Sequence, residues 1–192
     1  MTLHPLFLVA VWMTIFQPQQ QTVESNPLRR FHGTWKMVPG SLKSEPVPDG
    51  IDPKSITLEV VCREGADGLS MICEYKGNKT FITDQGRIPF LSDGSEMLVY
   101  EPNSKIIYKL GVTKNHSKVV EMTGTFVHIG KGTFENENKL LLTEYIAGGQ
   151  TPAGQHIYIW ESETIIREYS VYFGEDGEKI SESSWTLEKT DN

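Results

Sequence analysis

The chain has 192 residues, of which 38% are hydrophobic and 22% are charged, and it contains 17 glycines and 10 prolines. This length and composition are typical of one globular domain and exclude collagen-like, low-complexity and wholly disordered chains. The 25 acidic residues outnumber the 18 lysines and arginines, which gives a net charge of −7. Nucleic-acid binding needs a basic surface, so the charge argues against a nucleic-acid partner.

The N-terminal residues 1–23 contain no Asp, Glu, Lys or Arg, and residues 5–16 (PLFLVAVWMTIF) form an apolar run. The run is shorter than the roughly 20 residues of a membrane-spanning helix. It matches the apolar region of a signal peptide, which is typically about 7–15 residues long. We therefore expect residues 1–25 to be a targeting segment cleaved within 17–26, with no stable membrane span and with export to the periplasm or the medium. The alternative is an N-terminal strand or core segment.

Residues 26–192 are predicted to form one all-β domain. Short segments rich in β-branched and aromatic residues alternate with turn signals such as Asp49-Gly50, Asp67-Gly68, Gly77-Asn78, Asp93-Gly94 and Lys114-Asn115. Spacings of this kind predict successive antiparallel hairpins, and a long meander loses its exposed edges by closing. We expect a single up-and-down antiparallel β-barrel of about 8–11 strands. The predicted strands are 33–39, 55–63, 69–76, 79–83, 95–100, 105–112, 118–127, 139–145, 155–161, 164–173 and 179–189.

One hairpin can be aligned from its own sequence. In residues 55–63 and 69–76 the apolar side chains alternate with polar ones, and a two-residue turn at Asp67-Gly68 places Cys62 directly opposite Cys73. Both cysteines then lie on the apolar face, as a hydrogen-bonded pair with Cα atoms roughly 5.5 Å apart. In an exported protein this pair is expected to form a disulfide, whereas in a reducing compartment both would be reduced core residues.

The common signatures of enzymes and metal proteins are absent from the sequence. It has no H-E-x-x-H, no G-x-S-x-G, no P-loop and no Cys/His cluster at zinc spacing. We therefore assign no catalytic residues, no metal site and no cofactor. His128 and His156 are expected to face the barrel interior, either as hydrogen-bonded core residues or, in a less favoured interpretation, as the reactive groups of a haem carrier or a barrel enzyme.

The strand around Arg167 offers a candidate ligand anchor. Period-2 alternation places Ile165, Arg167, Tyr169, Val171 and Phe173 on one face, and this face is the more apolar one. It should point inward, where a buried guanidinium needs a partner. Arg167 and Tyr169 would then hold a carboxylate head group. The structural alternative is packing of the guanidinium on a tryptophan that closes the barrel.

Three further residues are lesser candidates for ligand contacts inside the barrel. They are His156, Tyr158 and Glu144.

Gly33-Thr34-Trp35, preceded by Leu28-Arg29-Arg30-Phe31, resembles the Gly-x-Trp start of lipocalins and their calycin relatives. This resemblance implies structural roles for Gly33 and Trp35, with the tryptophan plugging the closed end and Arg167 or Lys189 stacking on it. The pair Arg167 and Tyr169 also looks like the carboxylate grip of fatty-acid-binding proteins. Across residues 28–189, including YEPNSKIIY at 100–108 and DGEKI at 176–180, the layout is most similar to exported bacterial lipocalin-like domains of unknown function.

Together these features predict an exported protein that binds a small apolar or anionic ligand inside a β-barrel. An interior burial site would gain about 25 cal/mol per Å² of covered apolar ligand surface. The alternative is an inhibitor or interaction module with a protein partner, whose barrel is filled by its own side chains. A packed interior or a contiguous apolar patch outside would favour that alternative.

Overall fold

The computed structural model describes residues 25–46, 50–83, 86–117, 124–146 and 149–190. The expected targeting segment 1–25 therefore lies almost entirely outside the described residues. Among these residues no helix is long and apolar enough to cross a membrane.

The protein is an antiparallel β-barrel, as the sequence predicts. A short 3₁₀ helix, η1 (Pro27–Phe31), precedes eleven strands of one continuous sheet. The strands are β1 (Gly33–Met37), β2 (Lys43–Glu45), β3 (Ile51–Glu64), β4 (Ser70–Thr83), β5 (Gly86–Glu101), β6 (Ile106–Ser117), β7 (Gly124–Asn136), β8 (Lys139–Ile146), β9 (Gly154–Trp160), β10 (Ile165–Phe173) and β11 (Lys179–Thr190).

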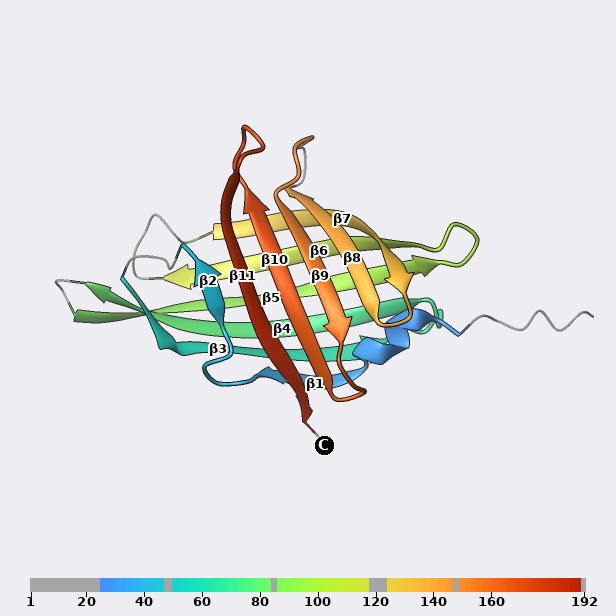
Figure 1. Ribbon diagram of the computed structural model, residues 1–192, viewed down its shortest axis with the longest axis horizontal. Helices are drawn as coiled ribbons and strands as arrows, with labels where there is room; N and C mark the ends of the chain where they lie inside the picture. The colour runs from blue at the N-terminus through green and yellow to red at the C-terminus, as the bar shows by residue number, and fades with distance from the viewer. Residues whose placement is uncertain (1–24, 47–49, 84–85, 118–123, 147–148, 191–192) are drawn as a thin grey trace, which may run out of the picture.

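Closure of the sheet comes from the first and last strands. Strands β3 to β11 pair in sequence order, and β1 pairs with both β3 and β11, which closes a ten-strand barrel. The short β2 extends the same region by pairing with β11 at residues 182–184, beyond the part that β1 occupies at 187–190. In Figure 1, β8 to β11 cross in front of β3 to β6, so the barrel is flattened into two sectors.

Three of the turn signals lie inside long strands and not in turns. Gly77-Asn78 lies in β4, Asp93-Gly94 in β5 and Lys114-Asn115 in β6, so the two segments 69–76 and 79–83 form one strand. At Gly94 a Cβ atom would sit about 2.5 Å from the Tyr75 hydroxyl. The glycine is therefore required for the close approach of an aromatic ring and not for a change of direction.

The β3–β4 hairpin has the predicted register. Cys62 lies opposite Cys73 and the two form a disulfide, with Cα atoms 4.0 Å apart. This spacing is closer to the ~4.5 Å of a non-hydrogen-bonded pair than to the expected ~5.5 Å. The turn is also longer than predicted: Gly65 pairs with Ser70, and Gly68 has a positive φ of 67°. The loop is longer by one residue on the β3 side and by one on the β4 side, so the register, with Cys62 opposite Cys73, is unchanged.

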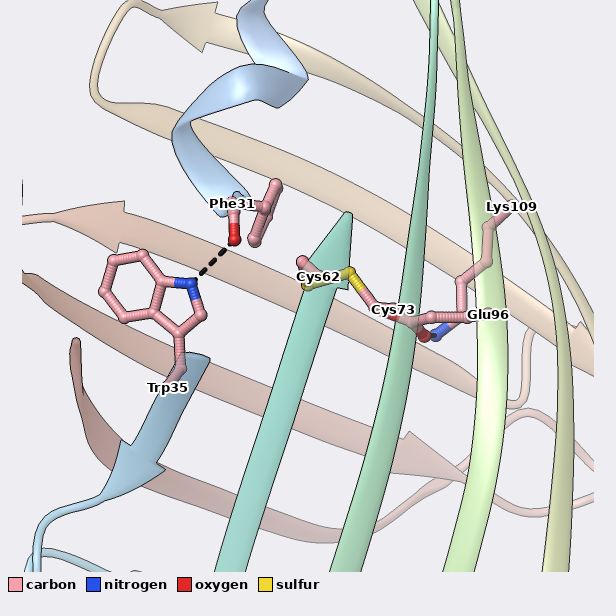
Figure 2. Close-up of a disulfide and its surroundings, with 6 residues drawn as sticks. All are labelled: Phe31, Trp35, Cys62, Cys73, Glu96 and Lys109. Atoms are coloured by element: carbon pink, nitrogen blue, oxygen red, sulfur yellow. Dashed lines mark hydrogen bonds and ion pairs between the residues drawn. A yellow bond between two sulfur atoms is a disulfide. The ribbon is translucent and has the colours of Figure 1, made fainter. Parts of the chain in front are cut away.

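One end of the barrel is plugged by η1 and Trp35. The Asn26 side chain caps η1 by accepting from the Leu28 N–H, and both Leu28 and Phe31 are buried. Trp35 is 1% exposed, and its indole N–H donates to the Phe31 carbonyl at 2.7 Å (Figure 2). The Lys189 ammonium lies 5.5 Å from the Trp35 ring centroid. Lys189, and not Arg167, is thus the cation that contacts this tryptophan.

The expectation that Arg167 points inward is wrong. In β10 the buried positions are Ile166, Glu168 and Ser170, whereas Arg167 and Tyr169 are exposed. Arg167 forms an ion pair with Glu161 at 2.7 Å and donates to the Tyr169 hydroxyl at 3.4 Å, all on the outer surface. The period-2 alternation is present, but the more polar of the two faces is the inner one.

Candidate functional site

The barrel encloses a cavity of about 310 Å³ beside the closed end. Part of its wall is apolar and consists of the disulfide together with aromatic and aliphatic side chains. The rest is polar and carries acidic, basic and histidine side chains from six successive strands, β5 to β10. The lining residues are Phe31, Trp35, Leu58, Val60, Cys62, Cys73, Tyr75, Glu96, Lys109, Gly111, Thr113, His128, Glu144, His156, Tyr158, Ile166, Glu168, Tyr172, Trp185 and Leu187.

Lys109 of β6 is the cation at the centre of the polar wall. Its Nζ lies 2.7 Å from Glu96 Oε2 on β5 and 2.7 Å from Glu144 Oε2 on β8. Figure 2 shows Glu96 and Lys109 next to the disulfide. Burial alone would lower the pKa of Lys109, but the charges of Glu96 and Glu144 outweigh burial and raise it above its ordinary value. The lysine is therefore permanently charged and fixed between two carboxylates.

Glu144 connects this ion pair to two histidines. Its Oε1 lies 2.9 Å from His128 Nδ1, and its Oε2 lies 3.8 Å from His156 Nε2. Burial would raise the pKa of Glu144, but interactions with His128, Lys109 and His156 lower it to about 2. His128 Nε2 lies 3.1 Å from the Thr113 hydroxyl, which in turn contacts the Tyr75 hydroxyl. The hydrogen-bond and ion-pair network thus extends along the polar wall of the cavity from β4 to β8.

The β9–β10 side of the cavity carries a second buried carboxylate. Ser170 donates its hydroxyl hydrogen to Glu168 Oε1 at 3.1 Å. A hydroxyl has one hydrogen, so the 2.9 Å contact between Ser170 Oγ and His156 Nδ1 must be donated by Nδ1–H. Nδ1 also lies 3.3 Å from Glu168 Oε1, which can accept but not donate. Neutral His156 therefore carries its proton on Nδ1.

This tautomer leaves a lone pair on His156 Nε2. The residue is 7% exposed, and Nε2 has no hydrogen-bond partner among the described residues. A buried polar atom without a partner is uncommon because it loses its hydrogen bond to water. In the neutral form, His156 Nε2 therefore presents an unused acceptor to the cavity.

Two tyrosines complete the polar wall. Burial and the nearby Glu168 charge raise the pKa of Tyr172 to about 12 and that of Tyr158 well above its ordinary value. Both hydroxyls remain neutral at physiological pH. The ring centroids of Tyr158 and Tyr172 lie 6.5 Å and 5.9 Å from that of His156. They surround the imidazole with aromatic surface.

A second hollow of about 350 Å³ adjoins the cavity on the side away from η1. It shares Leu58 and Trp185 with the inner cavity. Its other lining residues are the apolar Met37, Leu42 and Ile56, with Gly77 and the polar Thr57, Asn78, Lys79, Ser92 and Asn115. Trp185 has an indole nitrogen that is buried and makes no hydrogen bond to the described part of the chain. The second hollow and the inner cavity thus adjoin at Leu58 and Trp185.

Of the five ligand-contact candidates predicted from the sequence, three lie in the cavity wall and two do not. Glu144, His156 and Tyr158 line the cavity, together with His128, whereas Arg167 and Tyr169 lie on the outside. Sequence reasoning missed three charged residues of the site, which are Glu96, Lys109 and Glu168. Lys109 alternates with Tyr108 and Leu110, and these two apolar neighbours favour an inward face that excludes Lys109, so alternation alone does not place the lysine inside.

The potential metal ligands of the site do not form a metal centre. In the described ranges, no group of three or more His, Cys, Asp or Glu side chains is arranged to hold a metal ion.

Comparisons with known proteins find similarity among solved structures alone. The chain matches no family model and no curated protein. A solved structure of EF1p2_mFAP2b bound to DFHBI is similar over 86% of this chain and 98% of that one, with 15% sequence identity and a TM-score of 0.40. The site is accordingly interpreted from its own residues.

Proposed function

We propose that this protein is an exported, lipocalin-like carrier that holds a small amphipathic molecule inside its barrel. The observation that carries the proposal is the interior cavity, whose wall is apolar on one side and contains unused hydrogen-bonding capacity on the other. Its volume of about 310 Å³ lies at the lower end of the ~300–1,000 Å³ of small-molecule sites. The ligand is therefore small.

Burial of the ligand's apolar part would supply most of the binding energy, at about 25 cal/mol per Å² of covered surface. The second hollow adjoins the cavity at the apolar residues Leu58 and Trp185. Groups on the polar wall of the cavity would orient the molecule. The carboxylate anchor expected from Arg167 and Tyr169 is not available, since both side chains lie outside the barrel.

Export is supported by the Cys62–Cys73 disulfide, because disulfides persist in oxidising compartments. The apolar N-terminal residues 1–25 remain the proposed targeting segment. The intact mass of protein recovered from the periplasm or medium of its own source tests both points. A mass that lacks the segment and is two hydrogens lighter is expected, and a full-length reduced chain in the cytoplasm would contradict export.

Binding is tested with a variant that fills the cavity. Gly111 lines the cavity, and a Cβ atom there would lie 3.5 Å from Glu96 Cβ and Lys109 Cε, an ordinary contact. Gly111→Leu should therefore occupy the cavity without moving the backbone. Val112→Leu adds volume at the next position of β6, on the outer face, and serves as the control.

Native mass spectrometry of protein from its own source, followed by denaturing extraction, measures occupancy. We expect a stoichiometric small molecule on the wild type and on Val112→Leu, and none on Gly111→Leu. A molecule retained equally by both variants would place binding outside the cavity, and an empty wild type would contradict the carrier function.

The outer surface favours a second candidate function, that of a protein-interaction module. Ile72, Met97, Leu110 and Ile129 lie directly opposite one another on β4 to β7, and they are 39%, 39%, 48% and 42% exposed. Such a contiguous apolar row suits a protein contact. A filled interior was the other expected sign of an interaction module, and the cavity contradicts it. Sedimentation of the wild type against Leu110→Lys tests self-association through this row.

A further inference from the structure

The interior of the barrel carries more negative than positive charge. Three glutamates and one lysine line the cavity, so with neutral histidines the wall has an excess of two negative charges. Lys109 is shared between Glu96 and Glu144, which leaves Glu168 on the other side of His156. One of the two excess negative charges therefore belongs to the Glu96–Lys109–Glu144 cluster, and the other is Glu168 on the β9–β10 side of the cavity.

Glu168 has no lysine or arginine partner among the described residues. It is 6% exposed, and it accepts from the Ser170 hydroxyl and lies beside the Nδ1–H of His156. Within the described residues, its ion-pair partner is His156, which lies between Glu168 and a second carboxylate, Glu144, so two carboxylates share one imidazole. A buried carboxylate is costly without a cation. A ligand that carries a positive charge would compensate it.

His156 provides a second, independent indication of a ligand group that the protein itself does not supply. Its side chain is more than nine-tenths buried, and its Nε2 has no hydrogen-bond partner among the described residues and lies 3.8 Å from Glu144 Oε2 in the cavity wall. The groups that this wall offers to a ligand are two acceptors, the Glu168 carboxylate and Nε2 of neutral His156, and one unpartnered donor, the Trp185 indole N–H. An anionic ligand would add a further acceptor, whereas an ammonium group supplies three donors and the compensating charge.

The surroundings of these acceptors also suit a cation. Tyr158, Tyr172 and Trp185 line the cavity beside Glu168, and Trp185 pairs directly with Glu168 across β10 and β11. Aromatic faces next to a carboxylate form a favourable environment for an ammonium group. On the opposite side, the disulfide, Leu58 and Val60 form an apolar wall for the rest of the molecule.

We propose that the ligand is a protonated amine on a small aromatic or aliphatic body, with its ammonium group bound between Glu168 and His156 Nε2. This inference rests on the proposed carrier function and specifies its ligand class. The cavity has the volume of about ten liquid waters. Phenethylamine is of suitable size as a probe.

The test compares three probes of the same shape by isothermal titration calorimetry on ligand-free wild type at pH 7. Phenethylamine is cationic, 2-phenylethanol is neutral and 3-phenylpropanoate is anionic. We expect phenethylamine to bind about 10- to 100-fold more tightly than 2-phenylethanol, as is typical of hydrogen bonds to charged groups. The anion should bind more weakly than the alcohol.

Glu168→Gln keeps the shape of the side chain and removes its charge. It should bring the affinity for phenethylamine to within about threefold of that for 2-phenylethanol, while the affinity for the alcohol stays the same. Glu188→Gln makes the same change of charge at an exposed position of β11, and it should preserve the full preference for the amine. If Glu168→Gln does not fold, the three-probe comparison on the wild type decides the ligand class.

The possible outcomes distinguish a failure of this inference from a failure of the carrier function. Selective amine binding that is lost in Glu168→Gln supports the inference. Equal or tighter binding of the alcohol or the anion overturns the ligand class but leaves the carrier function standing. An amine preference that survives Glu168→Gln overturns the assignment to Glu168. No saturable binding of any probe to the wild type overturns both proposals.

Discussion

Replacing Glu144 by glutamine removes the carboxylate that joins Lys109 to the two interior histidines. The pKa of Glu144 is lowered from its ordinary value of 4.5 to about 2 in the folded protein. Each unit of such a shift corresponds to about 1.4 kcal/mol. The ionised side chain therefore contributes about 3 kcal/mol to the free energy of unfolding at pH 7, in line with the 3–5 kcal/mol typical of a broken buried ion pair.

The sign of this contribution fixes its pH dependence. A carboxyl whose pKa is lower in the folded state stabilises fully above the unfolded value near 4.5. The contribution is lost as the pH falls through the folded value near 2. The difference in unfolding free energy between wild type and Glu144→Gln should therefore be about 3 kcal/mol at pH 7 and about 1 kcal/mol at pH 3.

Urea denaturation followed by tryptophan fluorescence at pH 7, 4 and 3 measures this difference directly. Glu74→Gln is the control, because Glu74 forms an exposed ion pair with Arg63 at 2.7 Å and should contribute under about 1 kcal/mol. A difference for Glu144→Gln that is below 1 kcal/mol at pH 7, or that is the same at pH 7 and pH 3, would refute the argument.

Three other variants have defined outcomes. The double change Cys62→Ala and Cys73→Ala should lower the free energy of unfolding by about 3 kcal/mol, the value for a short disulfide loop; an unchanged urea midpoint would show that the bond does not form. Arg167→Ala should leave both the urea midpoint and the affinity for phenethylamine unchanged. A severalfold loss of affinity would contradict the placement of Arg167 outside the ligand site. Ser170→Ala removes a hydroxyl shared by His156 and Glu168 and should cost about 1–3 kcal/mol in the same assay, whereas a neutral result would contradict the assigned network.

Strand alternation and turn chemistry were sufficient to predict the barrel and one register. The apolar positions of β3 and β4 place Cys62 opposite Cys73 whether the turn has two or four residues, so the error in the turn did not matter. Turn signals alone were less reliable. Gly77 and Gly94 lie in strands, and at Gly94 a neighbouring aromatic ring requires the missing side chain.

The faces of β6 and β10 could not be assigned from hydrophobicity, because the side chains that both strands point into the barrel include charged ones, Lys109 and Glu168. Tyr108 and Leu110 are 46% and 48% exposed, whereas Lys109 between them is paired inside. In β10 the same inversion places Glu168 inside and Arg167 outside. Assigning these faces needs the full chain of cross-strand registers from the cysteines to β10, which local alternation does not provide.

One measurement tests both the carrier function and its ligand class: a crystal structure of the wild-type protein with phenethylamine. The account predicts the ligand in the interior cavity, with its nitrogen within hydrogen-bond distance of both the Glu168 carboxylate and His156 Nε2, and its ring toward the disulfide and Leu58. A ligand found on the outer surface beside Arg167, or an interior cavity that stays empty at saturating phenethylamine, would contradict it.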